Sequence, residues 1–240
     1  MSWKRPAEPA FPTVWYTFQA PDPDNDDQLV TYRVEDLTED RYDDIIQHYR
    51  DYFVDDEPIY ASRNTILDEM AMKELSDFWR WCLEQRLTVV CYKEGSAEIV
   101  GANLLHMEQS DDKGNWDIFQ SKTIQDVVKA HLYMTEQFNV FQRYNVDRYL
   151  TAYGLALNRR YRGRGIATEI LKARIPICRA FGVRLSATNF TAQASQKAAE
   201  KAGFRNDFEV SYDDFADMGA EYSFPKIKSK SLKLMSMPIE

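Results

Sequence analysis

The chain has 240 residues, 44% hydrophobic and 28% charged, which fits one large globular domain. Its net charge of −8 disfavours nucleic acid, whose phosphates repel an acidic surface. The odd number of cysteines, three, argues against a disulfide framework. No run of residues is long and apolar enough to span a bilayer, and the N-terminal residues lack the basic-then-apolar pattern of a secretory signal. We therefore expect a cytoplasmic protein that does not bind membranes.

The pattern of hydrophobic residues predicts strands that alternate with helices. Residues 1–28, rich in Pro, Asp and Asn, are expected to form an irregular arm before a single domain over residues 29–240. The predicted elements are, in chain order, a strand at 29–34, helices at 38–53 and 65–85, strands at 87–92 and 99–107, a helix at 123–141, a strand at 149–157, a helix at 166–181 kinked at Pro176, a strand at 183–188, a helix at 193–202, and strands at 208–212 and 232–237. This order predicts an α/β fold with a mixed sheet and helices on both faces.

A glycine- and arginine-rich loop lies between the strand at 149–157 and the helix that follows it. We call Arg160–Gly165 the Arg/Gly loop. Gly163 and Gly165 allow positive φ and a close approach of the backbone to a ligand, and the following helix directs free N–H groups at the loop. The sequence fits neither the P-loop nor the dinucleotide pattern, because Thr168 stands where the latter needs glycine or alanine. A phosphate site or a solvated basic turn both remain open.

The helix at 193–202 carries small residues on one face: Ala194, Ala198, Ala199 and Ala202. Small side chains let a slender ligand approach closely, although alanine is also the best helix former. A phosphate loop beside such a helix suits a long, thin cofactor.

Several motifs resemble one family. Arg160-x-x-Gly163-x-Gly165 is similar to the acetyl-CoA loop of the GNAT superfamily of N-acetyltransferases, and Lys201–Phe204 resembles the end of its last conserved helix. Tyr52–Ile59 and Glu136–Phe141 resemble segments of the insect-type arylalkylamine N-acetyltransferases. The resemblance implies a GNAT fold: a central mixed, largely antiparallel sheet that is splayed near its middle.

The resemblance also implies site residues. Acetyl-CoA would be held by main-chain or side-chain groups of Leu155, Ala156, Leu157, Arg160, Arg162, Gly163, Arg164, Gly165, Ile166, Ala167, Thr168 and Ser195. The amine substrate would contact Tyr52, Asp56, Pro58 and Ile59, and no metal is implied. The catalytic residues would be Glu57, Ser195 and Thr191.

Glu57 is the expected general base, because a protonated amine has no free lone pair to attack a thioester. Its neighbours Asp55 and Asp56, together with partial burial, are expected to raise its pKa. An exposed acidic helix end is the alternative. Many superfamily members place a tyrosine acid where this chain has Ala199, so Ser195 and Thr191 are the hydroxyls left to serve the departing thiolate.

The histidines fit no metal-site spacing. His131 is expected to be a core residue, and only His106 is kept as a weak catalytic candidate. Phe78, Trp79 and Trp81 are candidates for an aromatic amine pocket, although core packing explains such spacing equally well.

The resulting hypothesis is a monomeric N-acetyltransferase that acts on an arylalkylamine such as dopamine, serotonin, tyramine or octopamine. A polyamine or protein-lysine acetyltransferase and a non-catalytic acyl-CoA-binding module are the alternatives. The sequence leaves the amine, the preferred acyl chain and the acid for the thiolate open.

Overall fold

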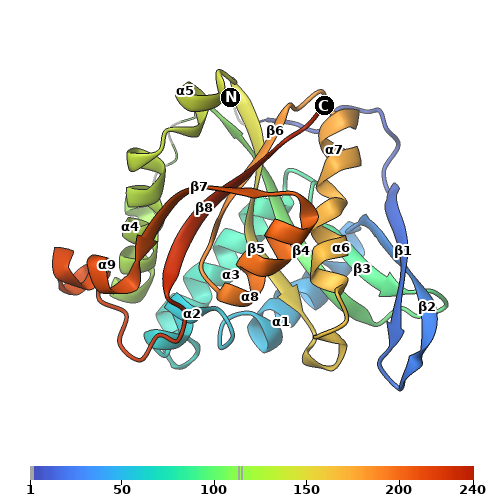
Figure 1. The fold of residues 1–240 in the computed structure, drawn as a ribbon, viewed down its shortest axis with the longest axis horizontal. Coiled ribbons are helices and arrows are strands. Elements are labelled where there is room, and N and C mark those ends of the chain that lie inside the picture. The colour runs from blue at the N-terminus through green and yellow to red at the C-terminus, as the bar shows by residue number, and fades with distance from the viewer. Residues whose placement is uncertain (1–2, 113, 115) are drawn as a thin grey trace.

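The computed structural model describes residues 3–112, 114 and 116–240. Strands from these residues form one sheet in the order β1-β2-β3-β4-β5-β6-β8-β7, in which only β5 and β6 run parallel (Figure 1). The strands are β1 (Val14–Asp22), β2 (Asn25–Asp36), β3 (Val89–Lys93), β4 (Ile99–Gln109), β5 (Arg148–Leu157), β6 (Leu185–Phe190), β7 (Arg205–Ser211) and β8 (Ser231–Pro238). The mixed, largely antiparallel sheet expected of a GNAT fold is confirmed.

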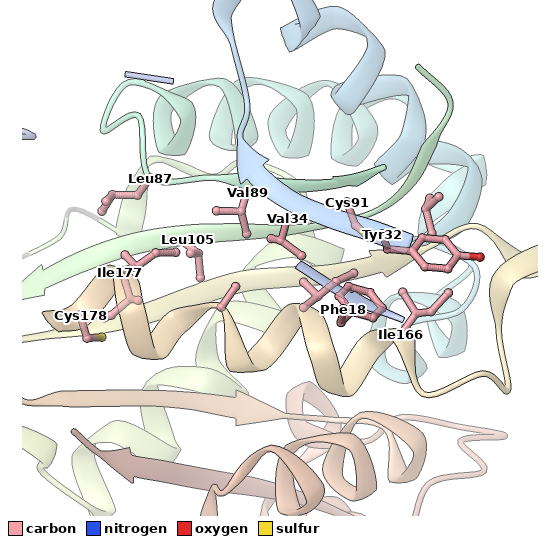
Figure 2. Packing of buried hydrophobic residues seen from close by; sticks show 14 of the residues in the cluster. Phe18, Tyr32, Val34, Leu87, Val89, Cys91, Leu105, Ile166, Ile177 and Cys178 are labelled. Atoms are coloured by element: carbon pink, nitrogen blue, oxygen red, sulfur yellow. The ribbon is translucent and has the colours of Figure 1, made fainter. Parts of the chain in front are cut away.

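Helices cover both faces of the sheet. They are α1 (Tyr42–Tyr52), α2 (Pro58–Ser62), α3 (Glu69–Leu83), α4 (Lys122–Gln137), α5 (Val140–Tyr144), α6 (Ile166–Lys172), α7 (Arg174–Ala180), α8 (Gln193–Ala202) and α9 (Tyr212–Met218). Side chains of α1 and α3 share one hydrophobic cluster with strand residues, whereas α6 and α7 pack into another. Figure 2 shows Ile166 and Ile177 on the side of α6 and α7 that faces β2, β3 and β4. No helix in the described ranges is long and apolar enough to cross a membrane.

The sheet divides between β5 and β6. These strands pair only at Leu150 and Ser186, whereas β6 pairs with β8 over its whole length. The predicted splay near the middle of the sheet is therefore present. Beyond Leu150, no strand of the described residues pairs with the edge of β5 that faces β6, so the main-chain groups there that no side chain occupies are available to a ligand.

A bulge in β5 lies at the same place. Asn103 of β4 pairs with Leu155, but Leu105 pairs with Ala152, which leaves Tyr153 and Gly154 as the bulged residues. Gly154 has φ +150°, and a Cβ there would lie 2.6 Å from Cε1 of Tyr49. Only glycine fits this position without a shift of α1.

The expectation of an irregular arm up to residue 28 is wrong from residue 14 onward, because β1 and the start of β2 form a hairpin at the edge of the sheet (Figure 1). Trp3 packs on Phe181 with ring centroids 5.5 Å apart, and Arg5 donates to both carboxylate oxygens of Asp36. Tertiary contacts thus order a segment whose composition indicates disorder.

Three helix predictions need correction. The helix expected over 123–141 is interrupted at Phe138, and the helix over 166–181 is divided at Ala173. Pro176 explains the second break, because it lacks the N–H that would bond to the carbonyl of Lys172. Pro58, which as a helix breaker is expected to end or bend the helix over 38–53, instead begins α2, a first-turn position where its missing N–H is harmless. By contrast, α8 ends as predicted at Gly203, with φ +104°.

Candidate active site

A cavity of about 670 Å³ lies at the gap in the sheet. The Arg/Gly loop, the end of β5 and the start of α8 line one part of it, and residues of α3 and α4 line another. The cavity thus joins the predicted cofactor loop to a chamber built by the segment between β4 and β5.

The backbone of the Arg/Gly loop suits an anion. Gly163 and Gly165 have φ of +82° and +79°, and Gly165 caps the N-terminus of α6. Within the described residues, the backbone hydrogen bonds of this region do not use the N–H groups of residues 163–167. Several N–H donors therefore remain for a phosphate, which fits the pyrophosphate of CoA.

The arginine side chains of the loop are engaged within the chain. Arg160 pairs with Asp24, and Arg164 pairs with Asp26 at 2.6 Å. Both aspartates lie near the tip of the β1–β2 hairpin. The charges of Arg160 and Arg164 are thus largely neutralised within the chain, and the backbone supplies most of the free donors of the loop.

Arg162 links the loop to the segment that carries Glu57. Its guanidinium donates to the carbonyl oxygens of Leu157 (2.9 Å) and Tyr52 (3.1 Å) and pairs with Asp56 at 2.7 Å. Because Asp56 precedes Glu57, one side chain fixes the cofactor loop relative to the predicted base.

Glu57 caps the N-terminus of α2 and faces the cavity. Its Oε2 accepts a hydrogen bond from the Tyr60 N–H at 2.7 Å, and Oε1 has no partner among the described residues. The side chain is only 8% exposed. Burial raises the pKa of Glu57 to about 7, against the opposing effect of the Thr191 hydroxyl and of nearby backbone N–H groups.

Of the two expected causes of this shift, burial is confirmed and repulsion by the neighbouring aspartates is wrong. Neither Asp55 nor Asp56 contributes to the raised pKa of Glu57. Asp55 is exposed, and the charge of Asp56 is met by Arg159 and Arg162. Removal of the carboxyl from water, rather than repulsion by like charges, makes it a stronger base.

The two predicted hydroxyl residues lie at the same part of the cavity. Thr191 is buried beside Glu57, and its carbonyl accepts a hydrogen bond from the Tyr212 hydroxyl at 3.0 Å. Ser195 lies in the first turn of α8 and donates to the carbonyl of Ala192 at 2.8 Å. The structure therefore brings Glu57, Thr191 and Ser195 to one cavity.

Most of the other predicted site residues also line the cavity, namely Tyr52, Asp56, Pro58, Leu155, Leu157, Arg162, Gly163, Gly165, Ile166, Ala167 and Thr168. Four do not. Ile59 and Ala156 are fully buried in hydrophobic clusters, because their positions in α2 and β5 face away from the cavity. Arg160 and Arg164 lie outside its lining and contact the hairpin instead.

Of the aromatic candidates on α3, only Phe78 lines the cavity. Trp79 is core, and Trp81 is 40% exposed. Phe78 packs edge-on to Tyr153, with centroids 4.9 Å apart, and lies beside Trp116. An aromatic chamber therefore adjoins the catalytic region.

Sequence reasoning missed several polar residues of the cavity, among them His131 and Glu108. His131, expected in the core, lines the cavity with Nδ1 3.2 Å from Nδ2 of Asn189, and burial lowers its pKa to about 4. Glu108, near the end of β4, also lines the cavity. Only its position two residues after His106 on one strand face could have indicated this location.

Arg174 spans the gap beneath the cavity. The side chain is fully buried and donates to Asn103 on β4 (2.9 Å) and to Thr188 on β6 (2.8 Å). Burial lowers its pKa to about 9, so it stays cationic at neutral pH. It joins the two parts of the sheet where strand pairing is lost.

The divided sheet, with a glycine loop at its gap, is the architecture of an acetyltransferase. The model of the acetyltransferase (GNAT) family matches residues 42–204, and the chain belongs to this family. Its acyl donor is therefore acetyl-CoA, with CoA as the product.

Solved structures agree. A putative arylalkylamine N-acetyltransferase 7 from the yellow fever mosquito Aedes aegypti is 44% identical, with a TM-score of 0.96 over 99% of this chain and 100% of that one. Arylalkylamine N-acetyltransferase 2 from Aedes aegypti is 20% identical, with a TM-score of 0.76 over 87% and 99% of the two chains. A Drosophila melanogaster polyamine N-acetyltransferase is 16% identical, with a TM-score of 0.76 over 87% and 100%. The last two show the fold alone.

Proposed function

We propose that the protein transfers an acetyl group from acetyl-CoA directly to the primary amine of an arylalkylamine, such as dopamine, serotonin, tyramine or octopamine, with Glu57 as general base. The observation that carries this proposal is the buried carboxyl of Glu57 at the junction of the cofactor loop and an aromatic chamber. The full-length similarity to a mosquito protein named as a putative arylalkylamine N-acetyltransferase supports the substrate class.

Glu57 is suited to accept a proton at neutral pH. A pKa of about 7 leaves a large share of the carboxyl ionised while making it a stronger base than an exposed glutamate. The hydrogen bond from Tyr60 holds one oxygen, so the other, Oε1, is free for the amine or an intervening water. The neutral amine can then act as a nucleophile.

The remaining residues bind and orient the reactants. When bound, acetyl-CoA supplies the thioester that the amine attacks, and its C–S bond breaks as the C–N bond forms. The free N–H groups of the Arg/Gly loop hold the pyrophosphate, and the unpaired edge of β5 receives the pantetheine arm. Since Ala199 cannot donate, the hydrogen bond to the thiolate would come from the hydroxyl of Ser195 or Thr191, which would turn from the carbonyl of Ala192 or from Glu57 to make it.

The cavity favours a small amine over a peptide. The segment between β4 and β5 forms part of the cavity wall through Trp116, Phe119, Ile124 and Val127. A protein-lysine substrate needs an open groove, which these walls oppose. The free, buried Cys82, Cys91 and Cys178 are consistent with a reducing cytoplasm, where we place the protein.

The test is thiol release from acetyl-CoA in the presence of aryl, polyamine and fatty amines. Wild type should turn over arylalkylamines most efficiently, whereas Glu57→Gln should lose turnover and keep CoA affinity. Wild type that binds CoA but acetylates no amine would refute the proposal and favour a non-catalytic binding module. A preference for polyamines would reassign the substrate class.

A further inference from the structure

A second carboxyl faces the cavity. Glu108 of β4 accepts a hydrogen bond at Oε1 from the hydroxyl of Tyr153, which fixes the orientation of the carboxyl. Among the described residues, no hydrogen bond uses Oε2 and no ion pair includes Glu108. The described part of the chain therefore presents Oε2 of Glu108 to the cavity without a hydrogen-bond donor.

Glu108 and Glu57 lie in different parts of the cavity. Glu57 caps α2, where its carboxylate accepts a hydrogen bond from the Tyr60 N–H. Glu108 lies on β4 and contacts Tyr153 of β5, whose ring packs on Phe78 and lies beside Trp116. A ligand that fills the cavity can therefore meet both carboxyls.

Tyr153, the hydrogen-bond partner of Glu108, belongs to a group of aromatic rings. Tyr153 lies 4.9 Å from Phe78 and 6.1 Å from Trp116 between ring centroids, and all three rings line the cavity. Burial raises the pKa of Glu108 against the opposing effect of the Tyr153 hydrogen bond, and no cation among the described residues adds to that opposition. A carboxylate that is buried away from water needs hydrogen-bond donors. For Oε2 of Glu108, the ligand is the group that can supply the donor.

We propose that Glu108 Oε2 accepts a hydrogen bond from an O–H or N–H group on the ring of the amine substrate, while the amino group lies at Glu57. This inference rests on the proposed function and narrows it to arylalkylamines that carry a ring donor. The aromatic side chains pack against the face of the substrate ring, and Glu108 accepts a hydrogen bond from the donor at the ring edge farthest from the amine. A plain phenyl ring would leave the carboxylate unpaired, so the cavity discriminates against it.

The test compares tyramine with 4-methoxyphenylethylamine and 2-phenylethylamine, which share its amine and lack the donor. In wild type, kcat/KM for tyramine should exceed both others by roughly tenfold to a hundredfold. Glu108→Leu should reduce this ratio to near one, and the isosteric Glu108→Gln should give an intermediate ratio. The exposed Glu136→Gln in α4 is the matched control and should keep the wild-type ratio.

Equal kcat/KM values for the three amines in wild type, or an unchanged ratio in Glu108→Leu, would overturn the inference. Wild type without turnover of any amine would instead refute the proposed function. In that case, calorimetric binding of tyramine and its methyl ether to the CoA complex still tests Glu108. CoA affinity and melting temperature, measured for each variant, show that the fold is retained.

Discussion

Replacing Glu57 by glutamine separates the catalytic use of this carboxyl from its effect on stability. Burial raises the pKa of Glu57 from 4.5 to about 7 in the folded protein. The folded state therefore binds more protons than the unfolded chain in this interval, and the free energy of unfolding falls as pH rises from 4.5 to 7. At about 1.36 kcal/mol per pH unit, the whole loss is about 3 kcal/mol.

Glutamine matches the shape of Glu57, carries no charge, and keeps an oxygen for the Tyr60 N–H. At pH 8 the Glu57→Gln variant should therefore be more stable than wild type by up to about 3 kcal/mol, or on the order of 10 °C in melting temperature. At pH 5 most of this difference should vanish. Because the base is lost, kcat should fall by about 10²–10⁴.

Urea unfolding at pH 5 and pH 8 measures the stability of wild type, Glu57→Gln and the exposed control Glu136→Gln. In parallel, kcat/KM for tyramine should rise with pH in wild type and level off above about pH 7, the pKa of Glu57. A Glu57→Gln variant less stable than wild type at pH 8, or one that keeps the wild-type pH profile, would refute the assignment of Glu57 as a buried base.

Other variants probe the gap in the sheet and the loop. In urea unfolding, Gly154→Ala should lower the free energy of unfolding by roughly 2–4 kcal/mol, since the new Cβ would lie 2.6 Å from Cε1 of Tyr49. The control Gly95→Ala has open space around its Cβ and should lower the free energy of unfolding by about 1 kcal/mol. Arg162→Met should lower kcat at saturating acetyl-CoA by at least about tenfold, because Glu57 would no longer be held in place relative to the Arg/Gly loop. The control Arg160→Met should change kcat less than about threefold. Equal effects of the two substitutions would contradict the linking role of Arg162. Arg174→Met should destabilise the protein by about 3 kcal/mol in the same urea assay, because its polar partners lose their donor, and a neutral effect would show that it does not hold the sheet together.

Local signals predicted which residues meet at the loop end of the cavity, whereas their role in cofactor binding stays a prediction. The strand before Arg160, the glycines of the loop and the small face of α8 follow one another in sequence, so their pattern alone indicates their contact. The helix break near Pro176 could also be predicted from the sequence, because the missing N–H of proline disrupts a helix within one turn of the proline itself.

The amine side depends on contacts between distant segments, and sequence reasoning was weaker there. Glu57 lies between two aspartates and a proline, a composition typical of an exposed turn, yet the packing of α2 beside Thr191 buries it. Glu108 and His131 lie in unrelated elements, and only the folded chain places both in one cavity. The strand β1 was missed because its order comes from pairing with β2.

The single pairing between β5 and β6 has a consequence for how the protein opens. Strands β6, β8 and β7 are tied to one another along their lengths, but the main chain joins β6 to β5 only at Leu150 and Ser186. Once the buried hydrogen bonds of Arg174 across the gap break, the C-terminal strands can separate from the rest as one cooperative unit, and amide hydrogens on both sides of β8 would exchange together. A ligand bound in the gap would contact both parts of the sheet, as a strand at that position would. It would therefore lower the population of molecules in which β6, β8 and β7 have separated from β5, and more so at higher ligand concentration.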